Sequence, residues 1–173
     1  SLNEDSPDIA ADLAALRGGE PGPLKTAAGR IVAGLRGRRE AGAGGMAVMS
    51  CDNLAANGET TRASILGFAT ALDPALAEWI GEHVTFPSTS IDRITPATTE
   101  ELVADVARQT GYEDAVPVVT EPFSSWVIQG EFPAGRPAWE NAGVEFVEDI
   151  DTFERRKLWL LNGAHSLLAY AGQ

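Results

Sequence analysis

Apolar residues recur along the chain in two patterns, one with helical spacing and one in short runs between turn residues. The helical spacing predicts five helices. The first covers residues 24–39, the second runs from residue 59 to a break at Asp73-Pro74, and the third runs from that break through Ile80. The fourth runs from a cap at Thr98 or Thr99 to Gly111, and the fifth covers residues 150–170. The short apolar runs predict strands at residues 46–50, 84–86, 116–119, 126–128 and 144–147. Residues 1–16 are acidic, and no element is predicted there.

The order of these elements predicts an α/β fold, because helices that separate short apolar strands build parallel sheets. The long helix over residues 150–170 departs from that alternation, and we expect it to begin a second, helical domain. Residues 1–149 and 150–173 are therefore expected to belong to different domains. The apolar residues of the last helix lie on several of its sides, which predicts that it is buried.

Composition narrows the classes of function. The formal net charge of the 173 residues is -12, which argues against a nucleic-acid surface because phosphate binding needs clustered Lys and Arg. One cysteine, Cys51, cannot form an intramolecular disulfide, and with only two histidines the chain lacks zinc-ligand spacing, so we expect no metal. No apolar run reaches the ~18 residues of a membrane-spanning helix, and the acidic N-terminus does not resemble a signal peptide. We expect a cytoplasmic protein.

Two polar segments follow predicted strands, at residues 50–58 and 86–96. In doubly wound sheets, ligands bind beyond the carboxyl ends of strands, where a side chain such as Asn53 can hydrogen-bond a bound group. Asp-Asn and Asn-Gly pairs also favour ordinary turns for local backbone reasons. In the second segment, Asp92 and Arg93 could form an ion pair that does no more than stabilise the loop. For both segments, a ligand site and a purely structural turn remain as alternative interpretations.

The third polar segment lies on the last helix. At ~100° per residue, Asn162 and His165 fall about 140° and 80° from Lys157, on one broad face. An ammonium, an amide and an imidazole together suit the polarisation and protonation of a carbonyl oxygen. The alternative is a packed helix whose Asn and His bond neighbouring backbone while Lys157 reaches water.

Four motifs in order resemble the mannitol 2-dehydrogenase and fructuronate reductase family, the polyol-specific long-chain dehydrogenases. They are Ser-Cys-Asp-Asn-Leu-x2-Asn-Gly at 50–58, Phe-Pro-x4-Asp-Arg-Ile-Thr-Pro at 86–96, Glu-Pro-Phe at 121–123 and Lys-x4-Asn-x2-His at 157–165. The resemblance implies the second half of a Rossmann-like dinucleotide-binding domain over residues 1–149. It also implies that residues 150–173 are the first long helix of a mostly helical C-terminal substrate domain.

The resemblance further implies that a secondary alcohol of a polyol or sugar acid is reversibly oxidised. The hydride would pass to NAD or NADP, of which NAD is favoured, and no metal would take part. Lys157 would be the general acid/base, and Asn53 and Asn162 would hydrogen-bond the reacting oxygen. His165 would orient the substrate or Lys157. Asp92 would support the site. Apart from the resemblance, the position of Glu154 one turn before Lys157 suggests the hypothesis that Glu154 relays a proton to water. The loop of Ser50, Cys51, Asp52 and Asn53 would adjoin the cofactor.

The sequence departs from the family pattern at Ala55, where proline is usual, and in the loop at residues 88–91. The chain is also short for the family, and the Gly-rich nucleotide motif that opens the first βαβ unit is absent. We therefore expect a central piece of a longer enzyme that alone binds nicotinamide weakly, does not turn over, and self-associates through exposed apolar surface. The alternatives are a non-catalytic α/β binding or scaffold module that needs a complementing chain, and an unrelated α/β protein with accidental motifs.

Overall fold

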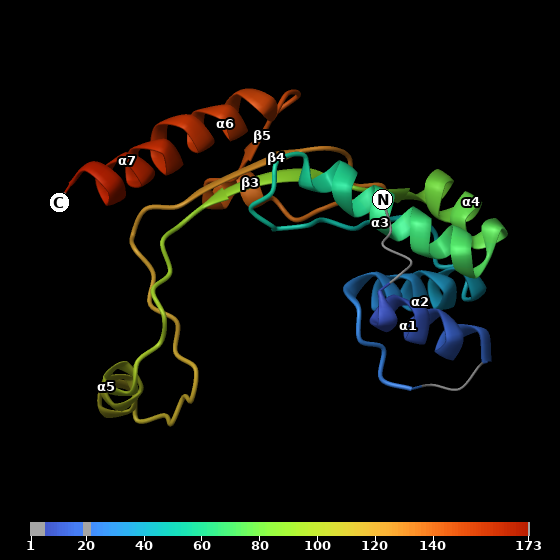
Figure 1. Cartoon of the computed structure of the whole chain (residues 1–173), viewed down its shortest axis with the longest axis horizontal. Helices are drawn as coiled ribbons and strands as arrows, with labels where there is room; N and C mark the ends of the chain where they lie inside the picture. The colour runs from blue at the N-terminus through green and yellow to red at the C-terminus, as the bar shows by residue number, and fades with distance from the viewer. Residues whose placement is uncertain (1–5, 19–21, 173) are drawn as a thin grey trace.

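The computed structural model describes residues 6–18 and 22–172 (Figure 1). Its α-helices are α1 (Pro7–Gly18), α2 (Ala27–Glu40), α3 (Asn57–Leu72), α4 (Pro74–His83), α5 (Glu100–Thr110), α6 (Asp151–Arg156) and α7 (Gly163–Ala171). A 3-10 turn, η1 (Trp139–Ala142), precedes the last strand, and a π-helical segment, η2 (Lys157–Asn162), joins α6 to α7. The strands are β1 (Met46–Ala47), β2 (Val84–Thr85), β3 (Ser88–Asp92), β4 (Ser125–Gln129) and β5 (Glu145–Phe146).

The strands form two small sheets. β1 pairs in parallel with β2, and β4 lies between an antiparallel β3 and a parallel β5. The backbone N–H of Val48 donates to the carbonyl of Thr85 at 2.9 Å, so pairing continues one residue beyond β1. Parallel pairing with helical crossovers confirms the predicted α/β class. The predicted strand at 46–50 is shorter than expected, whereas the strand at 126–128 is one residue longer at each end in β4.

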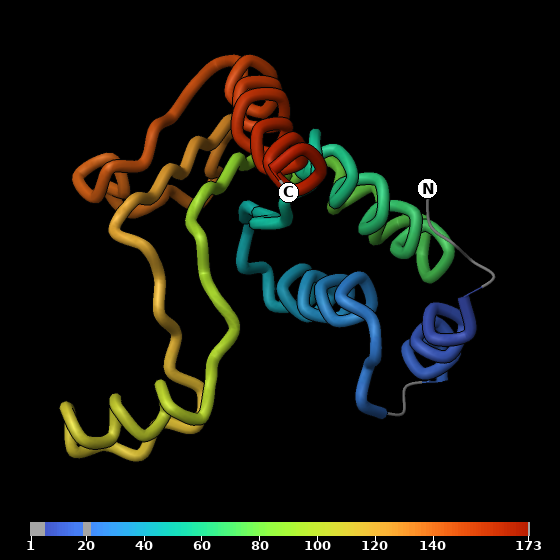
Figure 2. Tube along the Cα trace, turned by 60° about the vertical axis from the view of Figure 1, so that its left-hand side comes forward, coloured from blue at the N-terminus to red at the C-terminus, as the bar shows by residue number. Residues whose placement is uncertain are grey.

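The hydrophobic core lies among the first four helices and the β1–β2 sheet. α1 and α2 lie together beside α3 and α4 (Figures 1 and 2). Phe68, Leu76 and Ile80 are fully buried, and each contributes about 1.5–3 kcal/mol through the removal of its apolar surface from water. α4 begins at a proline, and the Asp73 carboxylate before it accepts from the N–H of Ala75, which explains the break between α3 and α4.

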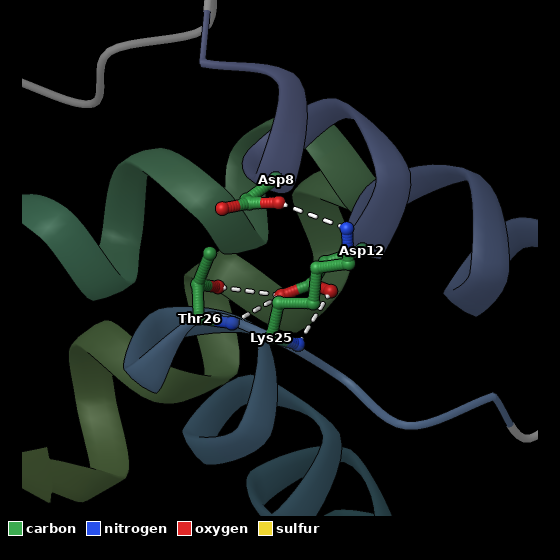
Figure 3. Close-up of polar contacts among 4 residues, drawn as sticks. All are labelled: Asp8, Asp12, Lys25 and Thr26. Carbon is green, nitrogen blue, oxygen red and sulfur yellow. Dashed lines mark hydrogen bonds and ion pairs between the residues drawn. The ribbon is translucent and has the colours of Figure 1, made fainter.

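Asp12 joins α1 to the start of α2 (Figure 3). Its carboxylate is 2% exposed and accepts from the backbone N–H of Lys25 at 2.9 Å, from that of Thr26 at 2.8 Å and from the Thr26 hydroxyl at 2.6 Å. Thr26 in turn caps α2, because its Oγ1 accepts from the N–H of Gly29 at 2.9 Å. A polar network therefore fixes the angle between these two helices.

The segment between β3 and β4 forms an arm that projects from the body and carries α5 at its end (Figures 1 and 2). The helix predicted from Thr99 to Gly111 is confirmed, with the Thr99 hydroxyl as its cap. The strand predicted at residues 116–119 is wrong. Val116 and Val118 are 70% and 65% exposed, and no described strand lies beside them to complete a ladder, so this part of the arm is extended but unpaired.

One α-helix and one strand were not predicted. α1 lies in the stretch to which the sequence pattern assigned nothing. β3 has the polar sequence Ser-Thr-Ser-Ile-Asp, and it becomes a strand because β4 supplies its hydrogen-bonding partner.

The helix predicted over residues 150–170 is one continuous rod, α6–η2–α7, with a π-helical middle (Figure 1). The expectation that it is buried is wrong for this chain. Trp159, Leu160 and Leu167 are 70%, 69% and 66% exposed, because no described element packs against the outer sides of the rod. Within the described ranges, no helix combines the length and apolarity needed to cross a membrane.

Candidate active site

A pocket of about 290 Å³ lies where the loop after β1, strand β3 and the α6–η2 rod meet. Its lining includes three carboxylates and two cations, together with amides and apolar side chains. The lining residues are Asp52, Asn53, Leu54, Ala55, Ala56, Thr89, Ser90, Asp151, Glu154, Arg155, Lys157, Leu158 and Asn162. The position agrees with the rule that α/β sheets bind ligands beyond the carboxyl ends of their strands.

Lys157 is one of the two cations that line this pocket. Its half-buried Nζ donates to Asn53 Oδ1 at 2.6 Å and to the carbonyl oxygen of Ile91. Asn53 belongs to the loop after β1, whereas Ile91 belongs to β3, so the ammonium joins three segments that are far apart in sequence. An ammonium has three donors, and these two acceptors leave one of them for a further group.

The π-helical segment brings Asn162 towards the side of the rod that carries Lys157. The N–H of Gly163 donates to the carbonyl of Leu158, five residues earlier, which is the π-helical pattern. Residues five apart lie nearly above one another in this geometry, whereas they are about 140° apart in an α-helix. Both Lys157 and Asn162 consequently line the pocket.

Glu154 approaches the loop from the same side of the rod. Both of its carboxylate oxygens lie 3.3 Å from the backbone nitrogen of Ala56. Ala56 immediately precedes α3 and has φ 49° and ψ 42°, a left-handed conformation that is uncommon for a residue other than glycine. The carboxylate therefore satisfies an N–H at the start of α3, where the helix dipole favours a negative charge.

Sequence reasoning missed two residues that hold this site together, Asn57 and Thr89. Asn57 is 1% exposed, and its Nδ2 donates to the carbonyls of Asp52 and Thr89, each at 2.8 Å. Its Oδ1 accepts from the backbone N–H of Thr89 at 2.9 Å, and the Thr89 hydroxyl donates to the carbonyl of Ser50 at 2.7 Å. The Asn-Gly pair at 57–58 was recognised as a turn signal and as the end of the first motif, but Asn57 itself was given no role, and nothing in the sequence distinguished Thr89.

The other candidate residues lie at the margin of the pocket or outside it. Ser50, Cys51, Asp92 and His165 do not line it. Asp92 is half-buried at the end of β3, and His165 is exposed on α7. Desolvation raises the pKa of the Cys51 thiol, although the residue as a whole is exposed, which disfavours a thiolate at neutral pH. Among residues 6–18 and 22–172, no group of three or more potential ligand side chains is arranged to hold a metal ion.

Phosphate recognition would need more positive charge than the pocket lining carries. The lining has three carboxylates and two cations, with amides from Asn53 and Asn162, and so suits an uncharged polar group better than a phosphate. Gly42 and Gly44 have positive φ, but they lie between a helix and the strand that follows, not between a strand and the helix that follows. That order does not build a pyrophosphate-binding turn.

A family model described as the mannitol dehydrogenase Rossmann domain matches residues 9–141. The chain belongs to the mannitol dehydrogenase family. It is similar to D-mannonate oxidoreductase of Escherichia coli strain K12, with 49% identity over 152 residues, covering 88% of this chain and 31% of the relative. It is similar to mannitol 2-dehydrogenase of Cereibacter sphaeroides, with 46% identity over 164 residues, covering 95% of this chain and 33% of the relative.

The fold is also that of solved structures in this group. The Pseudomonas fluorescens mannitol 2-dehydrogenase ternary complex with NAD and D-mannitol matches with a TM-score of 0.86 and 44% identity, over 99% of this chain and 34% of that one. The predicted family and the Rossmann-type fold are therefore confirmed. The chain spans about a third of the length of the curated relatives it matches.

Proposed function

We propose that this chain supplies the acid/base half of the active site in an NAD(P)-dependent oxidoreductase that interconverts a secondary alcohol of a polyol or sugar acid with its ketone. The observation that carries the proposal is the Lys157 ammonium, hydrogen-bonded at 2.6 Å to Asn53 within the pocket. The family relationship supports it, because relatives in this family are named for oxidation of mannitol or mannonate.

Lys157 is the group that moves the proton. In the oxidation direction its neutral amine takes the hydroxyl proton of the alcohol while the hydride leaves the same carbon. In the reduction direction its ammonium returns a proton to the ketone oxygen. Asn53 Oδ1 and the Ile91 carbonyl occupy two of its donors and leave the third for the substrate oxygen.

The two amides stabilise the reacting oxygen. Because Asn53 Oδ1 accepts from Lys157, its Nδ2 is directed away from the ammonium and can donate to the oxygen on which negative charge develops. Asn162, on the π-helical segment, supplies a second amide from the opposite wall. His165, one turn further along the rod, would orient substrate hydroxyls, and Asp92 would support the end of β3.

The cofactor, NAD in preference to NADP, would take or give the hydride when bound. Asp52 and Asn53 would form the wall beside its nicotinamide, and Ser50 and Cys51, which do not line the pocket, would support that wall from the same loop. We further propose that residues 1–149 complete a dinucleotide domain and that residues 150–173 begin a helical substrate domain. The chain alone is then expected to bind NADH weakly and to lack turnover. A micromolar NADH affinity measured by calorimetry on these 173 residues would contradict that expectation.

The deciding experiment compares Lys157→Ala with Lys157→Arg in the full-length protein. Arginine retains donors for Asn53 and Ile91 but cannot be deprotonated at working pH. We expect both variants to lose turnover by about 10²–10⁴-fold, with an unchanged circular dichroism spectrum. Lys25→Ala, which removes an exposed lysine outside the pocket, is the control and should retain turnover. Full turnover in Lys157→Ala would remove this residue from the mechanism and favour a non-catalytic module.

Glu154 is proposed to relay the proton between Lys157 and water. Glutamine at this position keeps an oxygen for the Ala56 N–H but cannot carry a proton. Glu154→Gln should therefore lower proton-transfer-limited turnover by about tenfold while leaving the fold intact. If stopped-flow measurements give an unchanged rate, the relay should be abandoned, although Lys157 would keep its role.

The substrate is a polyol or a sugar acid, and the pocket lining contains carboxylates and cations in similar number. A panel of mannitol, arabinitol, sorbitol, mannonate and altronate, each read with NAD and NADP, separates these classes. Turnover with none of them would contradict the proposed substrate class.

A further inference from the structure

The two acceptors of the Lys157 ammonium come from separate segments, and their spacing determines where the ammonium lies. One acceptor is the side chain of Asn53 in the loop after β1, and the other is the backbone carbonyl of Ile91 in β3. The β1–β2 and β3–β4–β5 sheets do not share a ladder. The loop and β3 are therefore not held in register by sheet hydrogen bonds, and side chains must provide the connection.

Asn57 and Thr89 provide it. The Asn57 amide donates to the carbonyl of Asp52, directly before Asn53, and exchanges two further bonds with the backbone of Thr89, two residues before Ile91. The Thr89 hydroxyl closes the ring by donating to the carbonyl of Ser50 at 2.7 Å. Both residues are almost fully buried, at 1% and 2% exposure, so these bonds do not compete with bulk water.

The neighbouring backbone leaves this connection little freedom. A Cβ added at Gly58 would lie 2.5 Å from the carbonyl oxygen of Phe86 and 2.6 Å from the Ser88 hydroxyl. The start of α3 is thus pressed against the chain that leads into β3. Asn57 sits at this contact and cannot move away from Thr89 without displacing α3.

We propose that Asn57 and Thr89 are positioning residues that set the separation between Asn53 Oδ1 and the Ile91 carbonyl, and through it the place of the Lys157 ammonium. Neither side chain carries out chemistry. This inference rests on the proposed role of Lys157 as the proton-transfer group. Positioning of this kind affects the chemical step more than binding, because a displacement of about 1 Å at a reacting group can cost about 100-fold in rate.

The test is Thr89→Val in the full-length protein. Valine has the shape of threonine but lacks the hydroxyl that holds Ser50. We expect kcat to fall by about 10- to 100-fold. The KM for the nicotinamide cofactor should change by less than about threefold, because the substitution affects the chemical step and not cofactor binding. Thr89→Ser restores the hydroxyl and should recover most of kcat. Thr70→Val is the matched control, since the Thr70 hydroxyl also donates to a backbone carbonyl at 2.7 Å but is exposed on α3 outside the pocket.

A double variant separates positioning from a general loss of structure. If Thr89 acts through the acceptors of Lys157, Thr89→Val should lower kcat less in an Asn53→Ala background than in the unaltered protein. Equal losses in both backgrounds would overturn the inference, as would a Thr89→Val enzyme with kcat within about threefold of the unaltered one.

The two proposals fail in different ways. Full turnover in Lys157→Ala refutes the function, whereas inactive Lys157→Ala with fully active Thr89→Val refutes only the positioning role. If Thr89→Val lacks the native circular dichroism spectrum, Asn57→Asp takes its place. It keeps the side-chain shape but turns an acceptor towards the carbonyls of Asp52 and Thr89, and the same outcomes for kcat then decide.

Discussion

Replacing Asp12 by asparagine changes one atom in a buried network and should cost far more stability than its size suggests. The Asp12 carboxylate accepts three hydrogen bonds, from the backbone N–H of Lys25 and from the backbone and hydroxyl of Thr26. Asparagine keeps only one acceptor oxygen. Its amide must therefore face an N–H donor, and that donor is left without a partner in a site that is 2% exposed.

The expected loss follows from these contacts. Hydrogen bonds to a charged group contribute about 1.5–3 kcal/mol each, and a buried donor left unpaired costs about 1–3 kcal/mol. Because relaxation and water recover part of this, we expect Asp12→Asn to lower the free energy of unfolding by about 2–3 kcal/mol. Asp8→Asn is the matched control. Asp8 forms an exposed ion pair with Lys25 at 3.0 Å (Figure 3), and such pairs are worth about 0–1 kcal/mol.

The effect should also depend on pH. Burial alone raises the pKa of Asp12, but the hydrogen bonds from Thr26 and Lys25 and the charge of Lys25 outweigh it, so the pKa lies below its ordinary value. A lowered pKa in the folded protein stabilises it above the unfolded value of about 3.9 and ceases to do so as the pH falls through the folded value. The stability difference between the native protein and Asp12→Asn should therefore shrink below pH 4.

Urea unfolding followed by circular dichroism at pH 7 and at steps below pH 4 measures both quantities. The reasoning is refuted if Asp12→Asn and Asp8→Asn lose equal stability at pH 7, or if the difference for Asp12 does not change with pH.

Two further predictions concern backbone contact and exposed apolar surface. Gly58→Ala should be destabilising, because its new Cβ would lie 2.5 Å from the Phe86 carbonyl oxygen. Gly81→Ala, in an open part of α4, should instead stabilise the protein by about 0.5–1 kcal/mol. A change of melting temperature in the same direction for both variants would contradict this. The chain alone should self-associate through the rod, where Trp159 and Leu160 are 70% and 69% exposed, and replacing both with serine should shift sedimentation towards the monomer. An unchanged sedimentation profile would place any self-association elsewhere.

The elements predicted well from sequence are those whose apolar residues repeat with a clear period or whose ends carry strong local signals. α4, between Pro74 and the following strand, and α5, between the Thr99 cap and Gly111, were found for this reason. α1 could also have been found. Pro7 begins it, and Ile9, Leu13 and Leu16 have helical spacing, but the apolar pattern is weak because aspartates and alanines fill the positions between them.

The strand errors have a different physical origin. A strand exists only when another strand bonds to it, and the sequence of one segment does not say where its partner lies. β3 is polar yet pairs with β4 over its whole length, whereas residues 116–119 are apolar and extend along an arm without a partner. The candidate site shows the same limit. Lys157 and Asn53 were predicted to meet, but the burial of Asn57 and Thr89 depends on how α3 packs against β3.

The polar contacts of the site also attach the C-terminal rod to the rest of the chain. Ile150, directly before the rod, is buried, and its backbone N–H donates to the side-chain oxygen of Gln129 in β4. Beyond that point, the side-chain hydrogen bonds that join residues 151–172 to the other described elements come from Glu154 and Lys157. These are the same two groups to which we assign proton transfer. Removing either one therefore weakens the attachment of the rod as well as the chemistry, and loss of turnover in Lys157→Ala has two possible causes. Lys157→Arg separates them, because arginine can keep the attachment while it cannot release a proton.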